Sequence, residues 1–380
     1  MLIKNRNFYR ITRFLLLMLP YLFKLFAKFR IAKKRVLIIK IDAIGDYILF
    51  RNYIEIVKTS DSYKDYQIDL LGNAVWKDIA LEYDNQFINE FLFIKPDSLY
   101  NEPLNTVILA WKLFKNNYQI VFHPTYARTL IADGLAAFTS AKQIIGFEGN
   151  DERINIRFKT VTDKFYTQKL LLPVNTIFEF ERNKSFFERV LNHPVKIAGP
   201  FIGAKKKIKQ GIVIFPGAGV HKRSWDIDKI LALIKLIRQH STETIFLAGS
   251  EAELQMGYYI TKNLPPGSVK NLIGKTTLPQ LILLIGNAAL VISSETSAVH
   301  IAVAAQTNTI CILGGGHFKR FAPYPEYMQN KPVCIFEKME CYNCNWNCKF
   351  QTNENDPYPC LSTIELSKVW LATKQLLSAI

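Results

Sequence analysis

The chain has 380 residues, of which 49% are hydrophobic and 21% are charged, so it can form two domains that each bury a core. This composition excludes a largely disordered protein. The formal net charge is +16, but residues 1–35 hold ten Lys or Arg and no acid, which leaves +6 for the other 345 residues. Because the excess charge lies mostly at one terminus and no nucleic-acid-binding motif is present, we expect no nucleic-acid partner.

The basic leader, residues 1–34, contains a ten-residue apolar run from Phe14 to Phe23 that is flanked by cations. The run is about half as long as a bilayer-spanning helix requires. No small-residue cleavage site follows it, so we do not expect secretion. Phe and Leu beside Lys and Arg are typical of an interfacial anchor, and we predict a cytoplasmic protein held peripherally at the inner face of the cytoplasmic membrane. A basic helix packed on its own domain and an uncleaved leader are the alternatives.

Beyond the leader, short β-branched runs alternate with helical stretches, which is the pattern of parallel βαβ units. In the first half we predict strands at 35–41, 67–72, 91–96 and 119–124 and helices at 47–58 and 127–138. In the second half we predict strands at 211–217, 244–249, 289–294 and 309–315 and a helix at 226–240. The pattern therefore predicts an α/β fold of two Rossmann-like domains, 35–200 and 201–380, joined by a linker near 192–210 and facing each other across a cleft.

Ligands of such folds bind beyond the carboxyl ends of the strands, so the loops there are the candidate sites. The first is 42–46, Asp-Ala-Ile-Gly-Asp, where Gly45 permits a tight turn. Asp46 opens the following helix and is either a helix cap or a carboxylate that faces the cleft.

The second loop is 215–225, where two glycines precede the adjacent cations Lys222 and Arg223 at the head of a helix. Backbone N–H groups and these cations predict a phosphate or diphosphate site, although the spacing is not that of a P-loop. The Asp226-x-Asp228 pair that follows imitates a metal-binding DxD motif, but we interpret it as a helix start. GxGxxG is absent, which disfavours a nicotinamide-dependent oxidoreductase.

The third loop, 293–300, places four hydroxyl side chains and Glu295 at the start of a small-residue helix, with His300 one turn in. That is more than capping requires, so the cluster indicates a ligand contact. A histidine at such a position is otherwise a packing residue.

In this order the loops make the chain resemble the lipopolysaccharide heptosyltransferase family, glycosyltransferase family 9. The matching stretches are RVLIIKIDAIGDYILF, YQIVFHPTYART with IIGF, IVIFPGAGVHKRSW, LAGSEAE, NLIGKTTLPQL and ALVISSETSAVHIAVAAQTNTICILGG. The resemblance implies the GT-B fold, with 35–200 as the acceptor domain and 201–380 as the donor domain. It also implies an inverting, metal-independent glycosyltransferase that moves heptose from ADP-heptose to a lipopolysaccharide core or related lipid-linked glycan and needs no cofactor for catalysis.

The resemblance assigns roles to single residues. Asp46 matches the general base, and Arg128 matches an arginine near the acceptor, while His123 stands where an Asp is common. Glu253 matches a carboxylate that binds ribose, and Thr276 a position whose backbone addresses adenine. The full donor-binding set that the resemblance implies is Gly217, Lys222, Arg223, Glu253, Thr276, Glu295, Thr296, Ser297 and His300.

The third loop departs from the family pattern Asp-Thr-Gly-x-x-His at two positions, where Glu295 replaces Asp and Ser297 replaces Gly. Either change can reshape the sugar pocket. The alternative functions are therefore transfer of a different donor sugar, and a nucleotide-sugar-binding protein of the same fold without catalysis.

A cysteine-rich segment, 341–360, lies in the C-terminal part of the chain. Its spacing, Cys341-x2-Cys344-x3-Cys348-x11-Cys360, is compatible with a structural zinc site. Reduced thiols in an ordered loop are an equal alternative, and disulfides would be favoured only in an exported protein. No cysteine lies in the three candidate loops, so we expect none to be catalytic.

Overall fold

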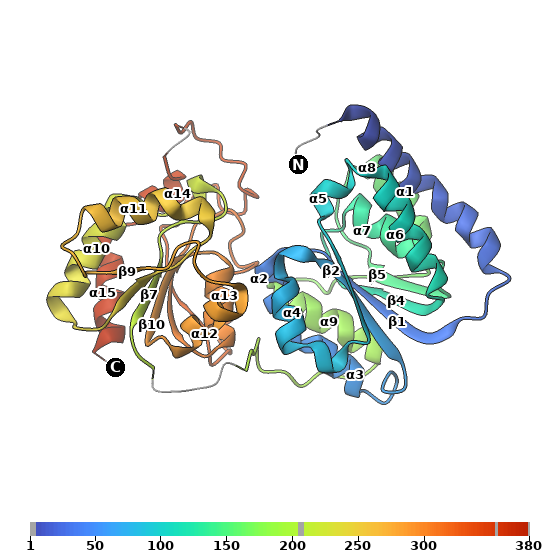
Figure 1. Ribbon diagram of the computed structural model, residues 1–380, viewed down its shortest axis with the longest axis horizontal. Coiled ribbons are helices and arrows are strands. Elements are labelled where there is room, and N and C mark those ends of the chain that lie inside the picture. Colours follow the sequence, from blue (N-terminus) through green and yellow to red (C-terminus); the bar gives the residue numbers. More distant parts are fainter. Residues whose placement is uncertain (1–4, 204–208, 354–355, 379–380) are drawn as a thin grey trace. The chain divides into compact units, whose positions relative to one another are not determined.

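The computed structural model describes residues 5–203, 209–353 and 356–378, which form two compact units (Figure 1). The first unit runs to Thr176 and includes Phe180–Lys196, and the second comprises Ile177–Glu179 and the chain from Ile197 onward. Residues 1–4 of the basic leader, the 204–208 part of the expected linker, and residues 354–355 and 379–380 lie outside the described residues.

The first unit is built on a six-stranded parallel sheet in the order β3-β2-β1-β4-β5-β6. Val36 of the central strand aligns with Ile68 on one side and with Ile120 on the other. Strands buried on both faces are continuously apolar, and Val36–Ile39 are fully buried. The strands are β1 (Lys33–Lys40), β2 (Gln67–Asn73), β3 (Glu90–Ile94), β4 (Tyr118–His123), β5 (Gln143–Phe147) and β6 (Gln168–Leu170).

Helices cover both faces of this sheet (Figure 1). Side chains of α1, α6 and α7 share one hydrophobic core with one face of the strands. On the other face Phe187 of α9 stacks on Tyr53 of α3 and meets Phe122 of β4 edge-on. The helices are α1 (Arg6–Ala27), α2 (Ile44–Ile48), α3 (Asn52–Thr59), α4 (Lys77–Tyr83), α5 (Pro96–Leu99), α6 (Pro103–Lys115), α7 (Leu130–Phe138), α8 (Ile156–Thr162) and α9 (Glu179–Leu191).

The basic leader forms α1, which packs along the first unit rather than standing apart from it. Asn5 caps its first turn by accepting from the backbone N–H groups of Asn7 and Phe8. Leu16 and Phe23 are buried in the core, so the alternative of a helix packed on its own domain describes one face of α1. Among the described residues no helix is long and apolar enough to cross a membrane.

The second unit repeats the topology of the first, with six parallel strands in the order β12-β11-β10-β7-β8-β9. In the centre of the sheet Val291 aligns with Val213 and Thr309. The strands are β7 (Ile212–Phe215), β8 (Ile245–Leu247), β9 (Lys270–Asn271), β10 (Leu290–Ser294), β11 (Asn308–Ile312) and β12 (Val333–Ile335).

One face of this second sheet shares a core with α10, α11 and α15, and Val299 of α13 packs with Cys311 on the other face. The helices are α10 (Ile227–His240), α11 (Leu254–Lys262), α12 (Leu278–Asn287), α13 (Ser297–Ala304), α14 (Pro359–Ser362) and α15 (Leu366–Leu377). Both units are thus Rossmann-like, as the alternation of strands and helices predicts.

All eight strands expected from the sequence are present, whereas β5, β6, β9 and β12 were not expected as strands. The helix expected at 47–58 is interrupted, because α2 ends at Ile48 and α3 begins at Asn52. Backbone N–H groups of Phe50 and Tyr53 donate to carbonyls three residues back, which tightens the chain between the two helices.

Candidate functional site

The candidate loops lie where the strand order of each sheet reverses. In the first unit these are the loops after β1 and β4, and in the second unit the loops after β7 and β10. Adjacent strands whose crossovers leave in opposite directions open a crevice at their carboxyl ends, which is where ligands of such sheets bind. The topology therefore selects the loops that the sequence selects by their residues.

A buried charge cluster forms at the carboxyl end of β1. The Asp42 carboxylate lies 3.1 Å from Lys40 Nζ, accepts from the Thr125 hydroxyl at 2.7 Å, and lies 3.6 Å from a guanidinium nitrogen of Arg153. Burial alone would raise the pKa of Asp42, but Lys40, the Thr125 hydroxyl and Arg153 together lower this pKa to about 2. Lys40 is fully buried, whereas the side chain of Arg153 is 54% exposed and remains accessible.

Asp46 lies half-buried in the first turn of α2, and the residues beside it are firmly anchored. Tyr47 stacks on Trp76 with ring centroids 3.9 Å apart and donates to Asp84 at 2.6 Å. Trp76 in turn donates its indole N–H to the carbonyl of Asp42 at 3.0 Å. The turn that carries Asp46 is thereby fixed at both ends, as a pre-positioned catalytic carboxylate requires.

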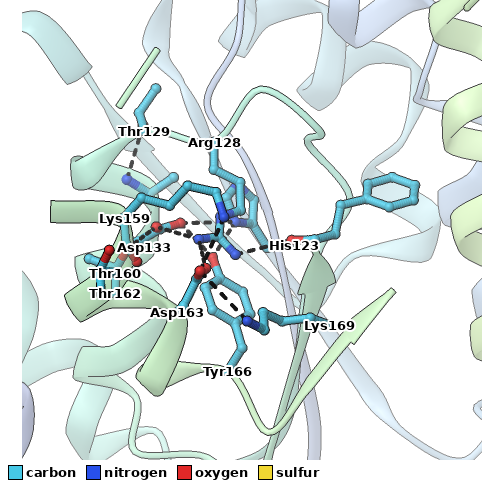
Figure 2. A network of polar contacts seen from close by, with 12 residues as sticks. His123, Arg128, Thr129, Asp133, Lys159, Thr160, Thr162, Asp163, Tyr166 and Lys169 are labelled. Carbon is cyan, nitrogen blue, oxygen red and sulfur yellow. Dashed lines mark hydrogen bonds and ion pairs between the residues drawn. The ribbon is translucent and has the colours of Figure 1, made fainter. Parts of the chain in front are cut away.

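A second polar network lies inside the first unit, behind β4 (Figure 2). The Tyr166 hydroxyl and the Thr162 hydroxyl both donate to Asp133 at 2.6 Å. Since the Tyr166 proton goes to Asp133, its oxygen accepts from His123 Nδ1 at 2.7 Å, which assigns the imidazole proton to Nδ1. Burial, with Arg128 nearby, lowers the pKa of His123 to about 3, so this histidine is neutral.

Arg128 belongs to this internal network, which differs from the acceptor contact expected for it. Its side chain is fully buried; it donates to the Phe147 carbonyl at 3.0 Å and pairs with Asp133 at 3.4 Å and with Asp163. A guanidinium held inside by two carboxylates does not face an acceptor sugar. In this structure Arg128 has a structural role, and its assignment as an acceptor-binding residue finds no support in these contacts.

In the second unit, the loop after β7 leaves room for a ligand at one glycine and packs closely at another. A Cβ on Gly217 would fall 2.3 Å from Glu253 Cγ, whereas no heavy atom lies within 4 Å of the corresponding point on Gly219. Glu253 is 7% exposed, and its carboxylate accepts from the backbone and hydroxyl of Ser250 in a capping box. The structure brings Gly217 and Glu253 together, with Glu253 engaged at the start of its own helix.

The two adjacent cations have different surroundings. Lys222 donates to the Thr352 hydroxyl at 3.0 Å. The Arg223 guanidinium lies 4.3 Å from the centre of the Trp346 ring and 3.5 Å from the Glu295 carboxylate, and its side chain is 27% exposed. Arg223 thus links the loop after β7 to the loop after β10.

Asp226 caps α10 by accepting from the backbone N–H groups of Asp228 at 2.8 Å and of Lys229 at 3.2 Å. The interpretation of this DxD-like pair as a helix start is confirmed. Asp228 in addition accepts from the Tyr259 hydroxyl at 2.6 Å.

The loop after β10 divides into groups that remain partly accessible and a buried histidine. Thr296 caps α13, and it and Ser297 are half-exposed, whereas Glu295 is 8% exposed beside Arg223. His300 is buried, with its Nδ1 2.9 Å from the Tyr324 hydroxyl, and burial lowers its pKa to about 4. The structure therefore places Glu295 beside Arg223, leaves Thr296 and Ser297 partly accessible, and buries His300.

Thr276 is half-exposed and directly precedes Thr277, which caps α12 through a capping box with Gln280. No side-chain contact joins Thr276 to the Arg223 and Glu295 pair in the described part of the chain. A role through its backbone thus stays a prediction.

Trp346 is a residue of the site that the sequence did not single out. Cβ atoms on Gly314 or Gly316 would fall within 2.7 Å of its ring, so the glycines after β11 make room for the indole that stacks on Arg223. Its indole N–H lies 3.2 Å from His317 Nδ1. The run of three glycines after a strand is the sequence signal for this close approach.

The four cysteines of 341–360 line one small pocket of about 10 Å³ together with Trp346, and all are free thiols. However, within the described ranges no three His, Cys, Asp or Glu side chains are arranged to hold a metal ion. The backbone N–H of Gly315 donates to the Cys360 sulfur at 3.4 Å instead, and burial raises the pKa of this thiol. The zinc site suggested by Cys341, Cys344, Cys348 and Cys360 is therefore not shown, and it and the alternative of reduced thiols in an ordered loop both stay predictions.

Comparisons with known proteins show what the chain is similar to. The profile of glycosyltransferase family 9 (heptosyltransferase) matches residues 181–351. Lipopolysaccharide heptosyltransferase 3 of Escherichia coli K12 is 25% identical over 357 residues, which cover 88% of this chain and 95% of the relative. The solved ADP-heptose LPS heptosyltransferase II of E. coli has a TM-score of 0.66 at 16% identity, covering 91% of this chain and 99% of its own. A glycosyltransferase family 9 structure from Veillonella parvula has a TM-score of 0.69 at 17% identity, covering 92% and 98%.

The two Rossmann-like units have the GT-B fold that the solved neighbours share. Beyond the fold, residues 181–351 match the family model of glycosyltransferase family 9 (heptosyltransferase), and most of the chain is similar to a lipopolysaccharide heptosyltransferase.

Proposed function

We propose that the chain transfers a heptose from ADP-heptose to a lipopolysaccharide core or a related lipid-linked glycan, by a single inverting displacement that needs no metal. The observation that carries the proposal is Arg223, held between Trp346 and Glu295 beside the open Gly219 of the same loop. A fixed, partly exposed guanidinium next to a glycine loop is suited to the diphosphate of a nucleotide sugar.

On the donor side, Arg223 and the backbone N–H groups of Gly217 and Gly219 would take the diphosphate, since that of Ala218 already donates to the Ser224 hydroxyl at 2.9 Å. Negative charge grows on the leaving ADP in the transition state, and preorganised donors stabilise it where it develops. This role replaces a divalent cation, which is the reason for proposing a metal-independent reaction. Glu253 is the proposed ribose ligand, which requires that it exchange part of its capping interaction for the sugar hydroxyls.

On the acceptor side, Asp46 is the proposed general base. The acceptor hydroxyl oxygen forms a bond to the anomeric carbon, the bond from that carbon to the phosphate oxygen breaks, and ADP leaves with its electron pair. The hydroxyl proton goes to the Asp46 carboxylate, whose modest basicity suffices because the hydroxyl becomes acidic only as the new bond forms. One displacement inverts the configuration.

Arg153 is the proposed acceptor cation in place of Arg128. It is half-exposed and lies 3.6 Å from Asp42, at the carboxyl end of the strand that leads to Asp46. A phosphorylated or carboxylated core sugar is a natural partner for an accessible guanidinium.

A cytoplasmic site of action is proposed because no small-residue cleavage site follows the apolar run of residues 14–23. The nucleotide sugar and the lipid-linked acceptor would then meet at the inner face of the cytoplasmic membrane. The name of the E. coli relative, a lipopolysaccharide heptosyltransferase, supports this choice of acceptor.

The alternative donor is favoured by one observation, since Glu295 is directly paired with Arg223 at the expected sugar pocket. Relative to the family pattern, Glu295 is one methylene longer than Asp, and Ser297 adds a side chain where the pattern has glycine. Calorimetry with a panel of nucleotide sugars, combined with product detection, distinguishes transfer of another sugar from binding without catalysis.

The proposed function is tested by mass spectrometry of the surface glycan from a deletion strain and from the same strain carrying the wild-type gene. We expect the deletion to remove one heptose and everything attached beyond it, and the wild-type gene to restore both. Loss of a different sugar would show a different donor, and an unchanged glycan would contradict the proposal.

A further inference from the structure

The outer face of α1 is apolar although the helix is already packed on the first unit. Leu16 and Phe23 are buried against the domain, whereas Phe14 and Leu25 are 62% and 59% exposed. The exposed set recurs at helical spacing along the face opposite the buried one and comprises Phe8, Ile11, Phe14, Met18, Leu22 and Leu25. A surface helix of a globular domain normally turns charged and polar residues outward, so this helix has a second apolar face without a partner in the described structure.

Helix α6 lies beside α1 and extends the apolar surface (Figure 1). Phe23 of α1 packs between Phe114 and Trp111 of α6, with ring centroids 4.5 and 6.4 Å apart. The outward side chains of α6 are apolar as well, with Leu104 71% exposed and Ile108 59% exposed. We call the exposed side chains of α1 together with Leu104, Val107, Ile108 and Trp111 the α1–α6 surface.

The α1–α6 surface is larger than a monomer normally leaves in water. If each of its large side chains exposes about 100 Å², the total is on the order of 1,000 Å², against the few hundred Å² usual for the largest patch of a soluble monomer. Such a surface needs an occupant.

The charges beside the surface identify the chemistry of that occupant. Arg6, Arg10, Lys24 and Lys28 recur on one flank of the α1 helix, next to the apolar face. None of the ion pairs among the described residues involves these four cations, and residues 1–35 contain no acid. An apolar face with unpaired cations along its edge is complementary to a surface that is apolar inside and anionic outside.

We propose that the α1–α6 surface inserts into the interfacial region of an anionic lipid bilayer, with its cations on the lipid headgroups and without spanning the membrane. A second copy of this chain is the less favourable occupant, because it would bring two sets of unpaired cations together. Trp111 and Tyr21 add amphipathic rings of the kind that lie at the headgroup level. This inference rests on the proposed function, because a membrane contact brings the protein to a lipid-linked acceptor. It deepens that function by assigning the contact to α1 and α6.

The binding test uses the full-length protein and vesicles of phosphatidylcholine with or without phosphatidylglycerol, separated by flotation. Wild type is expected to float with the anionic vesicles and to be released by high salt. The apolar variant Phe14→Ser/Leu25→Ser and the α6 variant Leu104→Ser/Ile108→Ser should each lower the partition coefficient about ten-fold or more. The charge variant, in which Arg6, Arg10, Lys24 and Lys28 become Gln, should lower it about 100-fold on anionic vesicles only.

The matched control is Leu254→Ser/Tyr258→Ser on α11, which removes two exposed apolar side chains from the second unit. This variant should float like wild type, and all variants should keep the wild-type circular dichroism spectrum because the changed side chains are exposed. Equal flotation of wild type and the apolar and charge variants would overturn the proposal. So would a stable dimer, seen by light scattering without lipid, that the same apolar variants dissociate.

Transfer to a delipidated, soluble acceptor separates this inference from the proposed function. The membrane variants should transfer to the soluble acceptor at the wild-type rate and lose rate only with acceptor embedded in vesicles. If wild type binds anionic vesicles but transfers sugar to neither acceptor, the proposed function fails and the membrane surface stands.

Discussion

The strand ends of the two units differ in how they hold charge, although the two sheets have the same strand order. At the ends of β1 and β4, Asp42 and Arg128 are buried and neutralised by partners from the same unit. At the ends of β7 and β10, Arg223 keeps part of its surface exposed and rests on an aromatic ring. The first arrangement holds a turn rigid behind Asp46, and the second leaves a cation available to a ligand. Equal topology is therefore compatible with the two roles proposed above, positioning in one unit and anion binding in the other.

The largest expected effect is that of Asp46→Asn, which keeps the size of the side chain and removes its basicity. We expect kcat to fall about 10²- to 10⁴-fold, because no base then takes the proton of the acceptor hydroxyl. The KM for the nucleotide sugar and the melting temperature should stay near the wild-type values. Steady-state kinetics with calorimetric melting checks this, and an undiminished kcat would remove Asp46 from the role of base.

Arg128→Leu probes the positioning network of the first unit. Removing the guanidinium leaves Asp133 and Asp163 without their main counter-charge, and we expect the free energy of unfolding to fall by about 3–5 kcal/mol. The matched control is Arg153→Leu, which removes an exposed guanidinium and should change stability by about 0.5 kcal/mol or less while raising the KM for the acceptor. Urea unfolding measures the stability of both variants, and steady-state kinetics measures the KM for the acceptor. Equal destabilisation by the two variants would contradict the division between a structural and an accessible arginine.

Arg223→Ala probes the anion-binding side. A charge-assisted hydrogen bond to phosphate contributes about 1.5–3 kcal/mol, so the Kd for ADP should rise about ten- to a hundred-fold. Lys222→Ala is the neighbouring control and should have a smaller effect, because Lys222 is directed to Thr352. Calorimetric titration with ADP gives both values, and the reverse order would assign the phosphate to Lys222.

The pH dependence of stability distinguishes the two units through one buried histidine in each. The pKa is about 3 for His123 and about 4 for His300, both below the ordinary value near 6.5. The unfolded chain therefore binds the extra protons, and stability that is complete above pH 6.5 is lost as the pH falls toward the folded pKa. Each histidine should remove about 1.4 kcal/mol per pH unit in that range.

His123→Gln should flatten this slope for the unfolding transition of the first unit only, and His300→Gln for that of the second. Urea unfolding followed between pH 7 and pH 5 measures the slopes. His240→Gln, at the exposed end of α10, serves as the control and should leave both slopes unchanged. If neither buried-site variant changes a slope, the two histidines are not held neutral by burial.

The sequence predicts the central strands and the loops after them because both have local signatures. β1, β4, β7 and β10 are apolar runs followed by glycine or polar residues, and their alternation with helices predicts parallel βαβ units. The edge strands β6 and β9 have three and two residues, too few for any periodicity to indicate them. What has no local signature is the direction of a side chain. Arg128 turns inward because Asp133 and Asp163, which come from two later segments, meet it there.

The same limit applies to the donor side. The pair Lys222 and Arg223 is visible in the sequence, but which of them is held near the ligand depends on Trp346 and Thr352, more than 100 residues further along the chain. The cysteine spacing is likewise readable, whereas the position of Trp346 among the thiols is a property of the folded segment.

The most direct measurement is mass spectrometry of a reaction that contains the wild-type protein, ADP-heptose and a lipopolysaccharide-core acceptor, with no added metal and with chelator present. We predict an acceptor heavier by one heptose residue, one ADP released for each product, and inverted anomeric configuration. Binding of the nucleotide sugar without product or ADP release, from any lipid-linked acceptor, would contradict the assignment of this chain as a heptose transferase.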